Sequence, residues 1–266
     1  MTTTYLLDNT RPETEHRFVN LERLYDPTSI RTLTAVGVTD GWRCLEVGAG
    51  GGSIARWLAD LVGPTGHVTA TDLDVRWVDT TGTRHRGNLD VVEHDLTRDP
   101  LPDTGYDLIH ARLVLMHLPD RDRVLTGLVD SLRPGGWLVV EELDPISPYQ
   151  PDPATPVDHL INRVGDAFTA ALERHGASNA RGRWARRILA DAGLVDVHNE
   201  GMVVVATGGS PAARLMQANA TQVADEMITE SGLTREDITR YVAALDDPQV
   251  TFFMPTFFSA YGRTRP

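Results

Sequence analysis

Residues 46–53 read Glu-Val-Gly-Ala-Gly-Gly-Gly-Ser, and this stretch decides the fold. It follows the apolar run 42–47, which is typical of a buried strand, and it leads into 53–62, whose apolar spacing predicts a helix. Glycines at such a turn permit positive φ and let a ligand approach the backbone. The helix start presents unpaired N–H groups. The pattern therefore predicts a strand–loop–helix unit that holds a nucleotide-like cofactor.

Strands and helices continue to alternate outward from this loop. Apolar runs predict further strands at 67–71, 89–93, 106–111 and 137–142, and a helix at 119–132. Continuous apolar strands separated by helices indicate a parallel sheet that is covered on both faces. Right-handed crossovers bring the carboxyl ends of all strands to one edge, where ligands bind.

The pattern changes on either side of this core. Upstream, helical spacing over 19–36 is interrupted near Pro27. Downstream we expect helices at 157–174, 183–192, 210–230 and 234–245, a strand at 195–207, and a β-rich end in which Pro255 marks an edge or a bulge. We expect a single domain over 1–266, with an N-terminal helical cover (1–40), a cofactor-binding core (41–144), a helical lid (145–192) and C-terminal strands and helices (193–266).

Composition narrows the partners. The chain has 266 residues and a net charge of -12, and an acidic protein repels phosphate backbones, so we expect no nucleic-acid partner. Cys44 is the only cysteine, which excludes an intramolecular disulfide and a CxxC zinc site. Neither a signal peptide nor a membrane-length apolar run is visible, so we expect a cytoplasmic protein without a membrane partner. The oligomeric state stays open, with a homodimer as one alternative.

The residues around the loop discriminate between cofactors. The dinucleotide fingerprint requires Gly or Ala where Ser53 stands. What fits is an acidic residue followed by alternating glycines, namely Glu46, Gly48, Gly50 and Gly52. An acidic residue before the loop suits a cationic ligand better than a pyrophosphate. S-adenosylmethionine carries a sulfonium and an ammonium group and no phosphate.

At this point the chain resembles the class I S-adenosylmethionine-dependent methyltransferases, and among them the small-molecule group. Five segments between 42 and 144 carry the resemblance in the expected order: EVGAGGGSIARWLA, TATDLD, EHDLTRDPLP, YDLIHARLVLMHLPD and LRPGGWLVVEELD. The C-terminal part is similar, less specifically, to bacterial enzymes that tailor secondary metabolites. The resemblance implies a Rossmann-like, three-layer α/β fold with a seven-stranded, mostly parallel sheet whose last strand is antiparallel. It also implies S-adenosylmethionine as cofactor.

The resemblance assigns cofactor-binding roles to matching positions. At the methionine end, Glu46 orients the amino-acid part. The loop backbone meets that part at Gly48, Ala49, Gly50 and Gly52, and the sulfonium has Ala111 and Arg112 beside it. At the adenosine end, Asp72 binds both ribose hydroxyls and Leu73 packs on the adenine. Asp95 accepts the adenine amino group, with the Leu96 N–H nearby. The alternatives are local: a tight turn for the glycines, a helix cap for Asp72, although Asp74 suits the cap better, and a turn for Asp95.

Methyl transfer requires an aligned nucleophile and, where the nucleophile is protonated, a group that removes the proton. His117 follows the fourth strand on the active edge and is the first candidate base. Glu142, at the end of the fifth strand, is the second. His117 could instead close the cofactor pocket, and a carboxylate at the end of strand five could cap a loop. His110 is expected to be a packed core group, and no metal site is expected.

Three functions remain open. The first is methyl transfer to a small molecule, with neither the acceptor nor O-, N- or C-methylation decided. The second is a nicotinamide oxidoreductase, which Ser53 and the absence of a Tyr-x-x-x-Lys pair disfavour. The third is a non-methylating use of the same fold, in a cyclisation or in cofactor sensing, which no sequence feature separates from the first.

Overall fold

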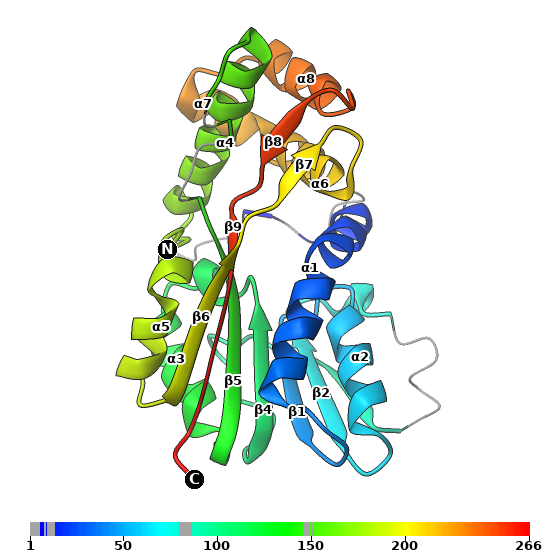
Figure 1. Cartoon of the computed structure of the whole chain (residues 1–266), viewed down its shortest axis with the longest axis vertical. Helices are drawn as coiled ribbons and strands as arrows, with labels where there is room; N and C mark the ends of the chain where they lie inside the picture. Colours follow the sequence, from blue (N-terminus) through cyan, green and yellow to red (C-terminus); the bar gives the residue numbers. More distant parts are fainter. Residues whose placement is uncertain (1–5, 8, 10–13, 80–86, 146–148, 151) are drawn as a thin grey trace. The chain divides into compact units, whose positions relative to one another are not determined.

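The computed structural model describes residues 6–7, 9, 14–79, 87–145, 149–150 and 152–266 (Figure 1). The chain divides into two compact units. The sheet unit comprises 25–142, 181–201 and 258–266, and the helical unit comprises 1–24, 143–180 and 202–257. The predicted boundaries at residues 40, 144 and 192, and the role of 145–192 as a lid, stay predictions.

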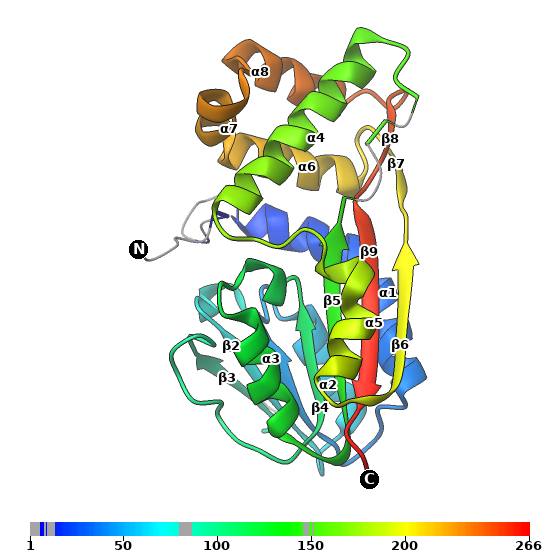
Figure 2. The same ribbon diagram turned by 90° about the vertical axis from the view of Figure 1, so that its left-hand side faces the viewer.

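The sheet unit contains a seven-stranded sheet in the order β3-β2-β1-β4-β5-β9-β6. The strands are β1 (Arg43–Val47), β2 (His67–Asp72), β3 (Leu89–Glu93), β4 (Tyr106–Arg112), β5 (Leu132–Asp144), β6 (Val195–Met202) and β9 (Thr256–Arg263). β1 pairs in parallel with both β2 and β4, so the strand order reverses at β1. The last strand, β9, is antiparallel to its neighbours (Figure 2). The predicted fold class is confirmed, and the reversal places the ligand edge at the carboxyl end of β1.

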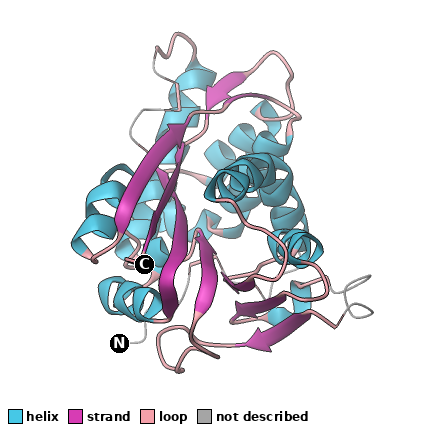
Figure 3. Ribbon diagram, turned by 60° about the horizontal axis from the view of Figure 1, so that its bottom comes forward, coloured by secondary structure: helices cyan, strands magenta, loops and turns pink. Residues whose placement is uncertain are grey.

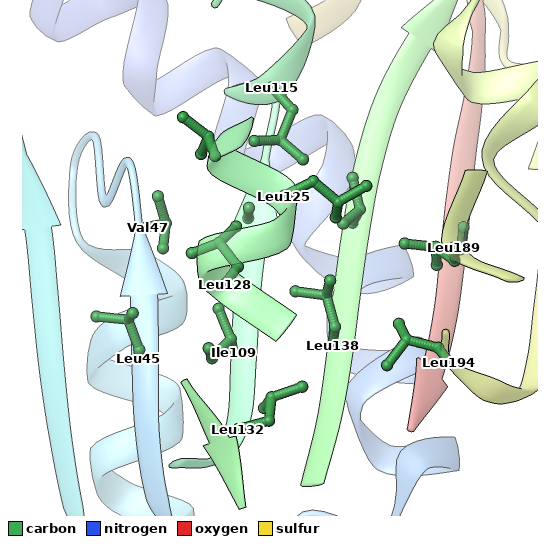
Figure 4. Close-up of a cluster of buried hydrophobic side chains, with 14 of the residues drawn as sticks. Leu45, Val47, Ile109, Leu115, Leu125, Leu128, Leu132, Leu138, Leu189 and Leu194 are labelled. Atoms are coloured by element: carbon green, nitrogen blue, oxygen red, sulfur yellow. The ribbon is translucent and has the colours of Figure 1, made fainter. Parts of the chain in front are cut away.

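Helices cover both faces of this sheet. One face is covered by α2 (Ser53–Val62) and the C-terminal part of α1 (Thr14–Val36), whose buried side chains share a core cluster. The other face is covered by α3 (Arg121–Asp130) and α5 (Arg181–Asp191), and Figure 4 shows leucines of this second cluster on the helices and on the strands of the sheet. Because apolar residues of β1 and β4 point to both faces, each strand is buried on both sides, as a parallel sheet requires.

The helical unit contains α4 (Pro156–Arg174), α6 (Pro211–Gln222), α7 (Ala224–Ser231) and α8 (Arg235–Ala244). β7 (Val205–Thr207) and β8 (Thr251–Phe253) form a separate antiparallel pair (Figure 3). Thr155 and Thr234 begin α4 and α8 with capping boxes, in which hydroxyl and Asp carboxylate satisfy the first backbone N–H groups.

Four predicted elements differ from the structure. The helix 119–132 ends at Asp130, because the chain from Leu132 already pairs with β4 and bulges before the ladder resumes at Trp137. The strand 195–207 is two strands, β6 and β7, which belong to different sheets. The helix 210–230 breaks at Val223 into α6 and α7. Pro255 separates β8 from β9 instead of lying within one strand, which agrees with its missing N–H donor.

The N-terminal helix also differs from the prediction. α1 continues through Pro27, where the sequence suggested an interruption. The proline removes one helical hydrogen bond. Tyr25 and Leu33, on either side of it, are fully buried, and this packing offsets the loss.

Candidate cofactor and active site

The glycine loop after β1 is held in a conformation that side chains disfavour. Gly48, Gly50 and Gly52 have φ of 69°, 55° and 84°. A Cβ at Gly48 would lie 2.3 Å from Cγ2 of Val114, in the loop after β4. The Ala49 N–H donates to the Thr71 carbonyl across 2.9 Å, which ties the loop to β2. Gly48 is therefore required by packing as well as by φ, so the loop is a fixed cradle at the ligand edge.

Asp72, the last residue of β2, faces the loop. Its Oδ2 accepts from the Gly50 N–H at 2.8 Å and its Oδ1 from the Asp74 N–H at 3.1 Å. Burial raises the pKa of the Asp72 carboxyl. Each carboxylate oxygen has two lone pairs, so both retain capacity for a ligand hydroxyl. Leu73 beside it is 58% exposed, and Asp74, rather than Asp72, caps the short helix η1 (Val75–Trp77).

Asp95 forms the turn that follows β3. Its Oδ1 accepts from the Thr97 N–H at 2.9 Å and from the Thr97 hydroxyl at 2.6 Å. Burial raises the pKa of this carboxyl, but the Thr97 hydrogen bonds outweigh burial and the net shift is downward. Leu96 packs its side chain against the core cluster of the α3 face. The turn alternative for Asp95 is thus what the structure shows, and its predicted adenine contact stays a prediction.

A buried ion-pair network crosses the sheet beneath the loop. The ring of His110 is fully buried on β4, with Nδ1 2.7 Å from Oε2 of Glu46 and Nε2 3.2 Å from Oε2 of Glu141. Burial lowers the pKa of His110, but the two carboxylates outweigh burial and raise it to about 9. The hydroxyls of Ser29 and Ser259 donate to Glu141. His110 is buried as expected, and the structure adds that its ring lies between two carboxylates, which favour the imidazolium form.

Arg112, which ends β4, is paired with the N-terminal helix. Its Nη1 donates to Asp26 Oδ1 at 2.8 Å and to Ser29 Oγ at 3.1 Å. The Ser53 hydroxyl, at the start of α2, donates to the same Asp26 oxygen at 3.0 Å. Sequence reasoning missed Asp26, because the following Pro27 suggested a break in the helix. Ala111 is fully buried on the opposite face, in the α3 cluster.

The two candidate catalytic residues lie close along the same edge. Glu142 is buried, and its Oε1 accepts from the Met116 N–H at 3.1 Å in η2 (Leu115–His117). Within the described residues its Oε2 has no hydrogen-bond partner. Burial raises the pKa of this carboxyl to about 8, although the Met116 N–H and Arg181 oppose the shift. His117 ends η2 and is partly buried.

A small cavity lies beside Glu142 on the α3 and α5 face of the sheet. Arg181 and apolar side chains complete its lining: Leu115, Leu125, Val140, Ala185, Ile188 and Leu189. A carboxyl in such surroundings stays protonated at neutral pH more readily than one in water. Glu142 can therefore exchange a proton near physiological pH.

Carboxylates dominate the polar groups around the glycine loop. Glu46 precedes it, Asp72 hydrogen-bonds its middle, and Asp26 bonds the residue that follows it. Such a set of anionic acceptors fits a ligand with cationic groups and hydroxyls, and it disfavours a pyrophosphate at the start of α2.

Comparison with known proteins agrees with this geometry. Residues 45–140 match the methyltransferase domain family model. Over these residues the chain carries a methyltransferase domain. The matched residues run from β1 almost to the end of β5, so the domain includes the glycine loop, Asp72 and His110.

Curated relatives match part of the chain, and solved structures share its fold. The ubiquinone/menaquinone biosynthesis C-methyltransferase UbiE of Pseudomonas putida is 28% identical over 146 residues, which is 53% of each chain. The chain thus spans about half the length of the curated relatives it matches. Phosphoethanolamine N-methyltransferase 2 of Haemonchus contortus aligns with a TM-score of 0.61 and 13% identity over 100% of this chain and 61% of that one. YcgJ of Bacillus subtilis aligns with a TM-score of 0.58 and 14% identity over 88% and 97%. These structures share the fold.

The described residues contain neither a helix that could span a membrane nor a cluster of metal ligands. None of the helices they form has the length and hydropathy to cross a bilayer. Nor do they contain three or more His, Cys, Asp or Glu side chains grouped so as to hold a metal ion.

Proposed function

We propose that the chain transfers the methyl group of S-adenosylmethionine to a small-molecule acceptor of secondary metabolism. The observation that carries the proposal is the glycine loop with Asp72 hydrogen-bonded to it at 2.8 Å and carboxylates at both of its ends. S-adenosylmethionine supplies an electrophilic methyl group on a sulfonium. The residues of this chain have to bind that cation, exclude water and orient the acceptor.

The cofactor is proposed to lie across β1, β2 and β4. Asp72 would accept from the ribose hydroxyls, and the exposed side chain of Leu73 would cover the adenine. Asp95 and the Leu96 N–H would contact the adenine edge. The backbone of the loop, positioned by Glu46, would meet the amino-acid part. Arg112, neutralised by Asp26, would lie near the sulfonium beside Ala111.

The relatives favour carbon as the first acceptor atom to test. The curated relatives are named as C-methyltransferases of ubiquinone and menaquinone biosynthesis. An aromatic or enol carbon acceptor is therefore the first class that we propose for this chain. Its net charge of -12 disfavours nucleic acid as an acceptor.

Glu142 is proposed to take the proton that the acceptor loses. Its pKa of about 8 lies close to working pH, which is the condition for effective general-base catalysis, and its Oε2 has no partner among the described residues. The bond from the Met116 N–H to Oε1 gives it a second, structural role in holding η2. His117 on η2 is the alternative base.

The proposal is tested by product analysis. The purified chain would be incubated with S-adenosylmethionine carrying an isotopically labelled methyl group and with phenolic, enol and amine acceptors. Labelled product formed in equal amount with S-adenosylhomocysteine supports the proposal. An acceptor that is cyclised while the cofactor stays intact, or reduced only when NADH is added, would reject methyl transfer as the function.

The general base is identified by measuring kcat/KM as a function of pH with the acceptor that the product analysis identifies. For the native chain we expect kcat/KM to rise with pH and to level off above about 8, because the deprotonated carboxyl is the active form. Glu142→Gln keeps an acceptor for the Met116 N–H and should lose this ionisation, whereas His117→Ala should retain it. Retention of the ionisation in Glu142→Gln and its loss in His117→Ala would transfer the role to His117.

A further inference from the structure

Seven side chains form one hydrogen-bonded chain that starts just before the glycine loop and ends just after it, and Ser259 branches from it at Glu141. We name it the loop-bracketing network, and its members in order are Glu46, His110, Glu141, Ser29, Arg112, Asp26 and Ser53. Ser29 connects the two halves, because its Oγ accepts from Arg112 at 3.1 Å and donates to Glu141. All seven belong to the sheet unit.

The network carries one net negative charge at neutral pH. Three carboxylates, those of Glu46, Glu141 and Asp26, face two cations, His110 and Arg112. Of the two cations, Arg112 lies closer to the loop in the sheet register. Its neighbour Ala111 pairs with Val47, the residue before Gly48. A ligand on the glycine loop therefore approaches a guanidinium that cannot lose its charge. Among the described residues, Asp26 is the carboxylate that pairs with this guanidinium directly.

We propose that Asp26 is a specificity residue that makes the loop site prefer the cationic cofactor to its neutral product. The inference rests on the proposed function and deepens it. S-adenosylmethionine carries one more positive charge than S-adenosylhomocysteine, and the two molecules are otherwise alike except for the methyl group. An uncompensated Arg112 would repel the first and leave the second almost unaffected. With Asp26 in place the network attracts the sulfonium, and this attraction ends when the methyl group leaves, which favours product release.

The test compares two dissociation constants in matched variants. Calorimetry would give the Kd of S-adenosylmethionine and of S-adenosylhomocysteine for the native chain, Asp26→Asn, Ser53→Ala and Arg112→Gln. Asp26→Asn keeps an oxygen for Arg112 and Ser53 but removes one charge. Ser53→Ala removes a hydrogen bond to the same Asp26 oxygen and no charge. Arg112→Gln leaves the Asp26 carboxylate uncompensated.

The three variants should change the ratio of the two dissociation constants in different directions. One unit of charge about 10 Å from a cation, at an effective dielectric constant of about 20, changes affinity roughly tenfold. Asp26→Asn should therefore weaken the binding of S-adenosylmethionine about tenfold relative to that of S-adenosylhomocysteine. Ser53→Ala should leave the ratio of the two dissociation constants unchanged. Arg112→Gln should strengthen the binding of S-adenosylmethionine relative to that of S-adenosylhomocysteine. Because Arg112→Gln should change this ratio in the opposite direction to Asp26→Asn, the proposal stays testable if Asp26→Asn does not fold.

Other outcomes separate the two proposals. If Asp26→Asn weakens both ligands equally, or if Arg112→Gln leaves the ratio unchanged, the network only holds the loop and the specificity role is wrong. If the native chain binds neither ligand, the proposed function itself is wrong.

Discussion

Replacing His110 by glutamine should destabilise the sheet unit by an amount that depends on pH. The pKa of His110 is raised from its ordinary 6.5 to about 9 by Glu46 and Glu141, which outweigh the opposing effect of burial. A shift of this size corresponds to about 3 kcal/mol of folding free energy. Because the pKa is raised in the folded state, this contribution is complete below pH 6.5 and is lost as the pH rises through 9. We therefore expect His110→Gln to cost about 3 kcal/mol at pH 6 and progressively less as the pH rises from 6.5 to about 9.

Urea unfolding at several pH values measures this difference directly. All five tryptophans belong to the sheet unit, so their fluorescence reports the unit that contains His110: Trp42, Trp57, Trp77, Trp137 and Trp184. The difference in free energy of unfolding between the native chain and His110→Gln should narrow as the pH rises from 6.5 to about 9. A difference that stays constant from pH 6 to pH 10 would refute the assignment of a buried imidazolium between two carboxylates.

Three further predictions follow from the structure. Gly48→Ala should destabilise the sheet unit by about 3 kcal/mol or more in the same urea assay, because the new Cβ would lie 2.3 Å from Cγ2 of Val114 and the φ is unfavourable. Gly37→Ala is the control: its φ is 88° but the space around it is open, so it should cost only about 1 kcal/mol. In the native chain the free energy of unfolding should fall between about pH 5 and pH 8, and Glu142→Gln should remove this fall. A carboxyl whose pKa is raised to about 8 contributes its full stabilisation below its ordinary pKa of 4.5 and loses it as the pH approaches 8. The same pH dependence in Glu142→Gln would show that this carboxyl is solvated. Thr234→Ala should lower the protection of α8 amides from hydrogen exchange by about 1 kcal/mol through loss of its capping box, and Thr239→Ala, within the same helix, should not; equal effects would contradict the cap.

The cofactor-binding core could be predicted because its signals are local. The glycine loop, the helix that begins at Ser53 and the apolar strands each depend on neighbouring residues, and the structure places β3 at the predicted 89–93. The reversal at β1 then follows from general rules of α/β connection.

The errors came from elements that long-range contacts decide. Nothing near Leu132 shows that it pairs with Tyr106, so the start of β5 was missed. The break between β6 and β7 likewise depends on which sheet each segment joins. Local rules read Pro27 as an interruption, whereas the buried side chains of Tyr25 and Leu33 keep the helix continuous.

In the candidate site, too, local features could be predicted and long-range contacts could not. Asp72 and Asp74 could be told apart, because the second is placed to cap the turn and the structure confirms that cap. The network around His110 could not be found, because Glu46, Glu141 and Asp26 are far apart in sequence and only the sheet register and α1 bring them together.

The central claim, a loop that binds S-adenosylmethionine through Asp72, is tested most directly by calorimetric titration of the native chain, Asp72→Ala and Asp74→Ala, with NADH as the control ligand. The native chain and Asp74→Ala should bind S-adenosylmethionine and ignore NADH. Asp72→Ala should bind it at least about a hundredfold more weakly, because hydrogen bonds to a carboxylate contribute about 1.5–3 kcal/mol each. Equal binding by all three proteins, or binding of NADH in place of S-adenosylmethionine, would contradict the account.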